Sequence, residues 1–210
     1  MISEVYNMDC LEYMRTIPDN FFSLALVDPP YGIKRSCIGK RKKWKYYKPK
    51  DWDEQPPDKA YFDELFRISK NQIIFGGNYF TRHLPSSMGW IVWDKGQKLT
   101  MSDGELIYTS FNRALRIVML HRTSICKYGG YIHPTQKPVD LYLWILRRYA
   151  EPGDSILDTH LGSGSSRIAA YMNGLDFWGC EKDEEYFSLQ EARFNRIINL
   201  KENVNEKNNL

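Results

Sequence analysis

The stretch SLALVDPPY spans residues 23–31 and predicts the centre of the fold. A short apolar run bounded by structure breakers is typical of a buried strand, so the DPPY turn is expected at its carboxyl end. Open α/β sheets bind their ligands at that end of the strands. Two prolines in a row fix φ and bring no N–H groups, which leaves the carbonyls of Asp28 and Pro29 outside any helix or ladder. A carboxylate, backbone carbonyls and an aromatic ring in one stiff turn suit a planar substrate with an amino group, such as an amino-purine.

A second motif, SILDTHLGSGS, spans residues 155–165 and precedes a predicted helix at 166–173. An apolar strand, an acidic residue, a glycine-rich turn and a helix together form a nucleotide-binding βα unit, in which the glycines let a ligand approach backbone N–H groups closely. The turn lacks the third glycine of the dinucleotide fingerprint and the Gly-Lys-Ser/Thr of a P-loop. It is therefore neither of those two motifs.

A third motif, HPTQKP at residues 133–138, lies before a predicted helix, where the helix N-terminus favours a negatively charged ligand group. Together the three motifs resemble motifs IV, X and I of the DNA amino-methyltransferases, which methylate adenine or cytosine amines with S-adenosylmethionine. This chain has Thr159 and His160 where that family often has Pro and Phe. The catalytic turn precedes the glycine turn, an order that resembles the beta class, and the stretch that ends in GGNYF at residues 76–80 resembles phage-type adenine methylases. The resemblance covers most of residues 1–198.

The resemblance implies the roles of the site residues. Asp28 and the Pro29 carbonyl would accept hydrogen bonds from the target amine, and Tyr31 would stack on a base flipped out of the duplex. The implied catalytic residues are Asp28, Pro29, Pro30 and Tyr31. The implied cofactor-binding residues are Asp9, Cys10, Asp28, Thr135, Lys137, Asp158, His160, Gly162, Ser163, Gly164, Ser165, Glu181 and Lys182.

Spacing supports one of these roles, and simpler roles compete with several. Glu181 ends a strand about 20 residues beyond the glycines, the distance that brings a carboxylate to ribose hydroxyls in a nucleotide-binding unit. Capping of the next helix is the alternative for Glu181 and for Asp9, whose two roles can coexist. For the third motif, the alternative is helix capping by Thr135 with Lys137 in solvent.

The order of segments predicts an α/β protein with a Rossmann-like methyltransferase fold and a mixed, mostly parallel sheet. The strands at 90–93, 105–109 and 114–120 are joined by turns too short for helices, which indicates an antiparallel edge. Residues 94–132 are the expected target-recognition region. Residues 76–80, GGNYF, are expected to form a second wall of the pocket, or else a plain strand-to-helix turn with Phe80 in the core.

Residues 34–50 contain nine Lys or Arg, no acidic residue and several aromatic rings. Such a block repels itself as a packed element, and basic residues with aromatics suit phosphates and unstacked bases. The block, within a loop of residues 34–58, is predicted to contact DNA through Lys40, Arg41, Lys42, Lys43, Trp44 and Lys45. The alternative is a solvated run of charge.

Composition sets the outer limits of these interpretations. The 210 residues are 42% hydrophobic with a formal net charge of only +3, so they indicate a folded globule and leave the evidence for a polyanionic partner to the charge distribution. The four cysteines are far apart and form no Cys-x-x-Cys pair, which argues against a zinc site or a disulfide framework. Without a leader-like segment or a long apolar run, the chain is expected to be cytoplasmic, in a bacterium, an archaeon or a phage-infected cell.

The sequence thus predicts one catalytic domain at residues 1–200, followed by a polar, frayed tail at 201–210. Its expected activity is methylation of adenine N6 in DNA, with DNA and S-adenosylmethionine as partners and no metal. Three alternatives stay open: cytosine-N4 methylation, methylation of RNA or a protein amide, and a catalytically silent DNA-binding or S-adenosylmethionine-sensing module. A chain this compact is either a homodimer or relaxed in its sequence specificity.

Overall fold

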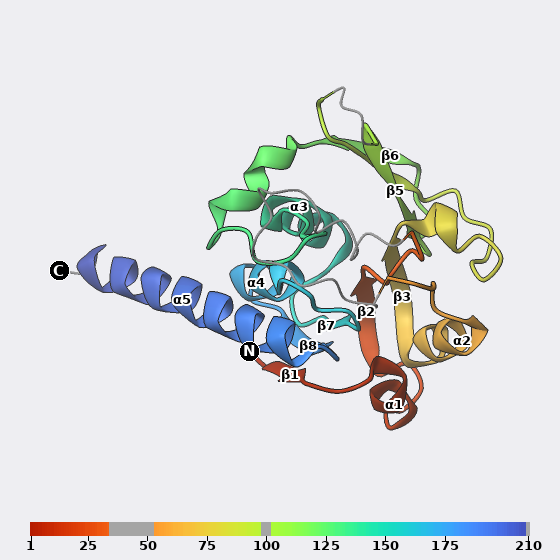
Figure 1. The fold of residues 1–210 in the computed structure, drawn as a ribbon, viewed down its shortest axis with the longest axis horizontal. Helices are drawn as coiled ribbons and strands as arrows, with labels where there is room; N and C mark the ends of the chain where they lie inside the picture. Colours follow the sequence, from red (N-terminus) through yellow and green to blue (C-terminus); the bar gives the residue numbers. More distant parts are fainter. Residues whose placement is uncertain (34–52, 98–101, 209–210) are drawn as a thin grey trace.

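The structure is a computed structural model that describes residues 1–33, 53–97 and 102–208. The described residues form one eight-stranded sheet with helices on its faces, as Figure 1 shows. The strands stand in the order β1-β8-β7-β2-β3-β5-β4-β6. Their bounds are Ser3–Tyr6 (β1), Phe22–Val27 (β2), Ser69–Phe75 (β3), Ile91–Asp94 (β4), Gly104–Thr109 (β5), Arg116–Met119 (β6), Ser155–Asp158 (β7) and Asp176–Cys180 (β8).

The described helices are α1 (Cys10–Arg15), α2 (Lys59–Ile68), α3 (Val139–Tyr149), α4 (Ser165–Met172) and α5 (Glu184–Asn208), with short 3-10 helices at Gly77–Tyr79 and Arg122–Lys127. Two hydrophobic clusters lie on opposite faces of the sheet. In β2, Leu24 and Leu26 join the cluster of α3, α4 and α5, while Ala25 and Val27 join that of α1 and α2. Successive residues of a strand point to opposite faces, so an unbroken apolar run is what a strand covered on both sides requires.

The sheet is mixed and mostly parallel, which confirms the predicted fold class. β5 runs antiparallel to both of its neighbours, β3 and β4. The predicted antiparallel edge contains fewer antiparallel pairings than expected, because β4 and β6 pair in parallel. β5 ends beside the start of β4, so the short connection at residues 110–115 is enough to place β6 on the far side of β4.

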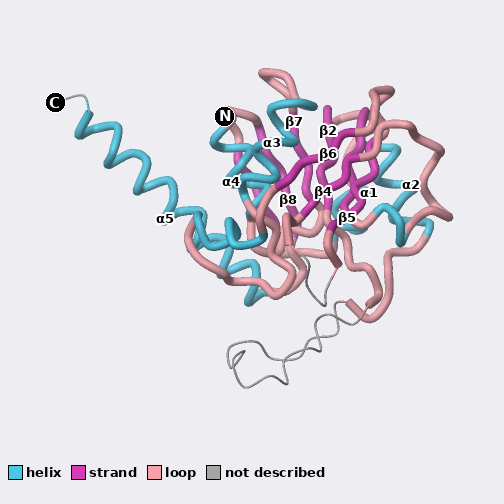
Figure 2. The backbone as a smooth tube through the Cα atoms, turned by 90° about the horizontal axis from the view of Figure 1, so that it is seen from above, coloured by secondary structure: helices cyan, strands magenta, loops and turns pink. Residues whose placement is uncertain are grey.

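The last helix is longer than the sequence predicted. α5 continues through Asn208, so the backbone is helical in most of the segment that the sequence predicts to be a polar, frayed tail. Lys and Glu are good helix formers even where nothing packs against them, which explains how a polar segment can extend the helix. Figure 2 shows the end of α5 leaving the body of the molecule. In the described part of the chain, no helix has both the length and the apolar character needed to cross a membrane.

Candidate active site

The carboxyl ends of the parallel strands bring the predicted site residues to one edge of the sheet. Asp28 follows β2, Asp158 ends β7 and Glu181 follows β8, and these three strands run parallel as neighbours. Two cavities lie at this edge, with volumes of about 730 Å³ and 360 Å³. Asp28, Pro30 and Lys137 line both cavities. The DPPY turn at residues 28–31, which is predicted to be catalytic, therefore forms part of the wall between the two cavities.

Most of the residues predicted to hold the cofactor line the larger cavity. Besides the shared wall, to which Thr135 also belongs, they are Asp9, Cys10, His160, Gly162, Ser163, Ser165, Glu181 and Lys182. Asp158 and Gly164 lie outside this lining and shape the glycine turn instead. Asp158 accepts hydrogen bonds from the Ser166 hydroxyl at 2.5 Å and from the His160 N–H at 3.0 Å. Gly164, with φ of +69°, is the N-cap of α4.

The glycine turn is held from two sides. The Gly162 N–H donates to Glu181 Oε2 at 2.8 Å, which ties the turn to the end of β8. Arg193 of α5 donates to the Ser163 carbonyl at 2.6 Å and to the Ser165 hydroxyl at 3.0 Å. These contacts fix the backbone of the turn before any ligand enters.

Burial changes the charge of two groups at this turn. It raises the pKa of Asp158 to about 7, against hydrogen bonds from Ser166 and the His160 backbone that favour the ionised form. It lowers the pKa of His160 to about 4, so the imidazole is uncharged at neutral pH. The His160 side chain therefore lines the larger cavity as a neutral group.

Asp9 has the capping role that competed with cofactor contact. Its Oδ1 accepts from the Leu11 N–H at 2.9 Å at the start of α1, which confirms the capping interpretation. Its Oδ2 lies 3.0 Å from Lys182 Nζ. Because Asp9 also lines the larger cavity, cofactor contact stays a prediction.

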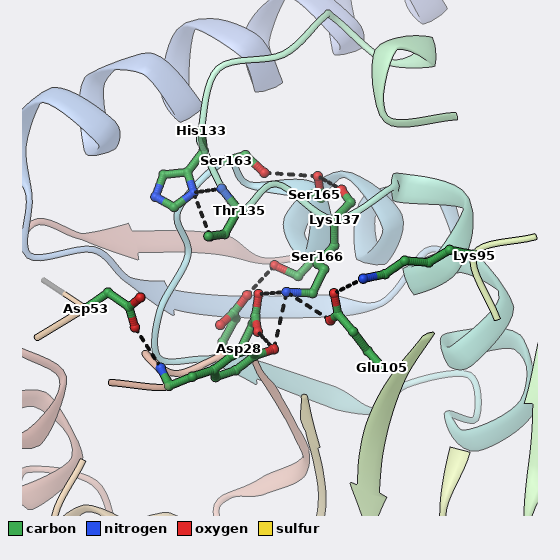
Figure 3. A network of polar contacts seen from close by, with 12 residues as sticks. Asp28, Asp53, Lys95, Glu105, His133, Thr135, Lys137, Ser163, Ser165 and Ser166 are labelled. Carbon is green, nitrogen blue, oxygen red and sulfur yellow. Dashed lines mark hydrogen bonds and ion pairs between the residues drawn. The ribbon is translucent and has the colours of Figure 1, made fainter. Parts of the chain in front are cut away.

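A chain of four charged side chains runs from the shared wall, at Asp28 and Lys137, along the lining of the smaller cavity, at Glu105 and Lys95. Figure 3 shows these side chains and their contacts. Lys137 Nζ donates to Asp28 Oδ2 at 2.7 Å and lies 3.4 Å from Glu105 Oε2. Glu105 Oε1 lies 2.9 Å from Lys95 Nζ. The other Asp28 oxygen accepts from the Tyr31 hydroxyl at 2.7 Å. Both oxygens of the predicted catalytic carboxylate are thus engaged.

The Asp28–Lys137 pair is buried, with 14% and 6% of the side chains exposed. Burial raises the pKa of Asp28, and the Lys137 charge only partly opposes this. Burial alone would lower the pKa of Lys137, but Asp28 and Glu105 raise it above its usual value. Lys137 is therefore a buried cation.

The third motif brings Lys137 to Asp28, and none of its side chains caps α3. The alternative with Lys137 in solvent was wrong, since its side chain is buried against Asp28. α3 begins after Pro138 with no side-chain capping bond, and the Thr135 hydroxyl instead lies 3.2 Å from His133 Nδ1. Gln136 donates to the Gly130 carbonyl at 2.9 Å and accepts from the Ile132 N–H at 3.0 Å, which closes the preceding loop.

The segment after β3 forms the second wall, and both interpretations of it hold. Gly76, Asn78 and Tyr79 line the smaller cavity, while Phe80 is buried in the core. The Tyr31 and Tyr79 rings stack with centroids 4.8 Å apart. A Cβ built on Gly76 would lie 2.4 Å from the Tyr31 ring, so only glycine fits beneath the tyrosine.

Three residues of the smaller cavity were missed by the sequence analysis: Asp53, Lys95 and Glu105. Asp53 Oδ1 accepts from the N–H groups of Tyr31 at 2.9 Å and Gly32 at 3.0 Å, so it fixes the backbone of the catalytic turn. Nothing local in the sequence marks that contact. Glu105 left a usable signal, since it shares a strand face with the buried Ile107 and a charge on an inward face calls for a partner.

The predicted DNA contacts Lys40, Arg41, Lys42, Lys43, Trp44 and Lys45 lie outside the described residues. In the expected recognition region, two basic side chains bind the protein itself. Lys127 pairs with Asp140 at 3.1 Å, and Arg113 donates to the Arg148 carbonyl at 2.6 Å. The assignment of DNA contacts therefore stays a prediction.

Comparison with known proteins places this geometry in a family. The model of the DNA methylase family N6_N4_Mtase matches residues 88–192, which is half of the chain and includes the third motif and the glycine turn. The type II methyltransferase M1.MboII of Moraxella bovis is 22% identical, over 93% of this chain and 98% of its own length.

Two solved structures share the fold. The M1.HpyAVI–SAM complex has a TM-score of 0.61 and 18% identity, covering 93% of this chain and all of that one. The PvuII DNA methyltransferase, described as cytosine-N4-specific, has a TM-score of 0.61 and 17% identity, covering 93% and 92%. At this identity the two structures bear on the fold alone.

Replacement of Gly76 by alanine tests the packing of Tyr31. Gly76 has a φ of +65°, and its Cβ would overlap the Tyr31 ring. Gly174→Ala is the matched control, because Gly174 has a φ of +70° with nothing within 4 Å of its Cβ. We expect Gly174→Ala to cost about 1 kcal/mol of unfolding free energy from backbone strain, and Gly76→Ala about 3 kcal/mol from strain and overlap. Equal losses in urea titrations would contradict the close contact.

Asp158→Asn tests the charge state of the buried carboxyl. The folded-state pKa of about 7 lies above the value for an unfolded chain, so this group costs stability progressively as pH rises towards 7. We expect the variant to gain about 2 kcal/mol of unfolding free energy relative to wild type between pH 5 and pH 7. A difference between the two proteins that does not change with pH would show that Asp158 ionises normally.

Proposed function

The chain belongs to the N6_N4_Mtase family of DNA methylases, and from that membership we propose that it transfers a methyl group from S-adenosylmethionine to the N6 amine of adenine in DNA. The observation that carries the proposal is the position of Asp28 in the wall between the two cavities. A carboxylate there can hold an amine on one side within reach of a methyl donor on the other. Transfer needs that alignment more than it needs covalent chemistry.

The larger cavity is the proposed cofactor site. Its volume of about 730 Å³ lies within the range for sites that enclose small molecules. The Glu181 carboxylate and the Asp9 carboxylate stand at the strand ends where nucleoside hydroxyls and amines find acceptors. The glycine turn and the N-terminus of α4 supply a wall of small residues, which permits close approach.

The smaller cavity is the proposed site of the flipped base. Asp28, Pro29 and Tyr31 line it on one side, with Tyr79 on another. The lone pair of adenine N6 is delocalised into the ring. Hydrogen-bond acceptors for both of its N–H groups favour a geometry in which this lone pair points at the methyl group. Bound S-adenosylmethionine supplies an electrophilic sulfonium methyl group. As the N–C bond forms and the S–C bond breaks, the nitrogen becomes positively charged and its extra proton can pass to Asp28.

Cytosine N4 is the alternative target, because the same acceptors serve any exocyclic amine. The Asp before Pro-Pro-Tyr supports adenine, since it resembles the adenine-specific form of the motif and the cytosine-specific form has Ser. The basic, aromatic block at residues 34–50 supports a polynucleotide substrate. The homodimer, like the DNA contacts, is a prediction from the sequence.

The first test is product analysis. Purified protein is incubated with methylation-free amplified DNA and labelled S-adenosylmethionine, and the digested nucleosides are identified by mass spectrometry. We expect N6-methyldeoxyadenosine. N4-methyldeoxycytidine would keep the mechanism and change the substrate, and the absence of both products despite cofactor binding would contradict the proposal.

Asp28→Asn tests the role of the carboxylate. The amide keeps one acceptor oxygen and replaces the other with a donor, so we expect the methylation rate to fall about a hundredfold or more. Asp63→Asn is the control, because Asp63 forms an exposed pair with Lys59 at 2.6 Å, away from both cavities. Normal methylation by the Asp28→Asn variant would exclude the proposed role, and methylation by wild type alone would exclude the silent module.

A further inference from the structure

Glu105 lines the smaller cavity, and the proposed reaction gives it no role. It lies on β5, a strand distant in sequence from all three motifs, and its carboxylate stands between two cations, Lys95 and Lys137. Burial alone would raise the pKa of Glu105, but Lys137 and Lys95 lower it below its usual value, so the group is ionised. Among the described residues, the lining of the smaller cavity therefore pairs two carboxylates with two ammonium groups.

The two carboxylates bind Lys137 unequally. Lys137 Nζ lies 2.7 Å from Asp28 Oδ2 in a hydrogen bond, and 3.4 Å from Glu105 Oε2 without one. Glu105 Oε2 is buried and has no hydrogen-bond partner among the described residues. An ionised oxygen in that state is costly, so it is a ready acceptor for the Lys137 ammonium, which already lies within 3.4 Å and needs only to point an N–H at it.

The reaction gives Lys137 a reason to make this move. Asp28 must accept a hydrogen bond from the target amine, but its oxygens already accept from Tyr31 and Lys137. The amine nitrogen also gains positive charge as it is methylated, and a cation held beside the same carboxylate opposes that charge. Transfer of the ammonium to Glu105 relieves both conflicts and keeps Lys137 paired, while the charge that develops on the amine pairs with Asp28.

We propose that Glu105 is a positioning residue that draws the Lys137 ammonium away from Asp28 when the target amine binds. The inference rests on the proposed function, since it assigns Asp28 to the amine. In the structure Lys137 holds the Asp28 carboxylate in place through the hydrogen bond of 2.7 Å. When the base enters, Glu105 takes the cation and the amine takes the released position on Asp28.

The competing explanation is structural. Glu105 of β5 is paired with Trp93 of β4, and Lys95 directly follows β4, so the Lys95–Glu105 ion pair could serve only to stabilise this hairpin. In that case removal of either partner should affect the protein equally. If Glu105 receives Lys137, removal of Lys95 leaves the acceptor intact, and removal of Glu105 abolishes it.

The experiment compares Glu105→Gln, Lys95→Gln and the double variant in single-turnover methylation of methylation-free DNA at saturating S-adenosylmethionine. Affinity for S-adenosylmethionine and the melting temperature are measured in parallel. We expect Glu105→Gln to slow methyl transfer about tenfold or more, Lys95→Gln to change it less than about threefold, and cofactor affinity to stay within about twofold for both. The double variant should be as slow as Glu105→Gln, because it also lacks the acceptor.

Equal slowing by the two single variants would overturn the inference in favour of a structural pair. Recovery of the rate in the double variant would also overturn it, since net charge and not the acceptor would then be decisive. Methylation by wild type with either of these outcomes would leave the proposed function standing. Absence of methylation by wild type would overturn both.

Discussion

The buried ion pair between Asp28 and Lys137 is the contact on which the site depends. It joins residues 109 positions apart, one at the end of β2 and the other just before α3. Two desolvated charges gain little net stability from each other, but Asp28 without Lys137 would be a buried charge with no cation beside it. The pair therefore commits the third motif to a single position over the sheet, and the wall between the cavities follows from that position.

Hydrogen bonds with neighbouring groups hold the pair and the adjacent backbone in one geometry. Asp53 holds the backbone N–H groups of the catalytic turn, and Tyr31 fixes the second oxygen of Asp28. Beside the larger cavity, Glu181 and Arg193 bind the glycine turn from β8 and α5. Such outer contacts hold reacting groups in geometry before the substrate arrives, which is the main contribution available to an enzyme whose chemistry lies in its cofactor.

Sequence patterns predicted those parts of the molecule that local physics decides. The apolar runs of β2 and β7, the proline and glycine turns after them and the helical spacing of α2 and α3 depend on neighbours along the chain. Two of the motifs meet at one edge because β2 and β7 are parallel and share a carboxyl end, and the Lys137–Asp28 pair brings the third motif to them. The sequence could not show that β6 lies beyond β4, that Asp53 reaches back to Tyr31, or that Lys137 is buried, since each depends on packing between distant segments. The length of α5 was missed because polarity suggested a tail although Lys and Glu favour helix.

The charge state of the larger cavity is also suited to an electrophilic methyl donor. A thiolate or other strong nucleophile beside such a donor would compete with the target amine for the methyl group. Cys10 lines this cavity, and burial raises its pKa to about 12, so the thiol stays protonated. His160, whose Nε2 lies 3.9 Å from Cys10 Sγ, has a pKa of about 4 and cannot stabilise a thiolate as an imidazolium would at neutral pH. Burial thus suppresses the reactivity of Cys10 and His160. The Asp28 carboxylate, which is the acceptor in the wall between the cavities, lies where the amine is expected to enter.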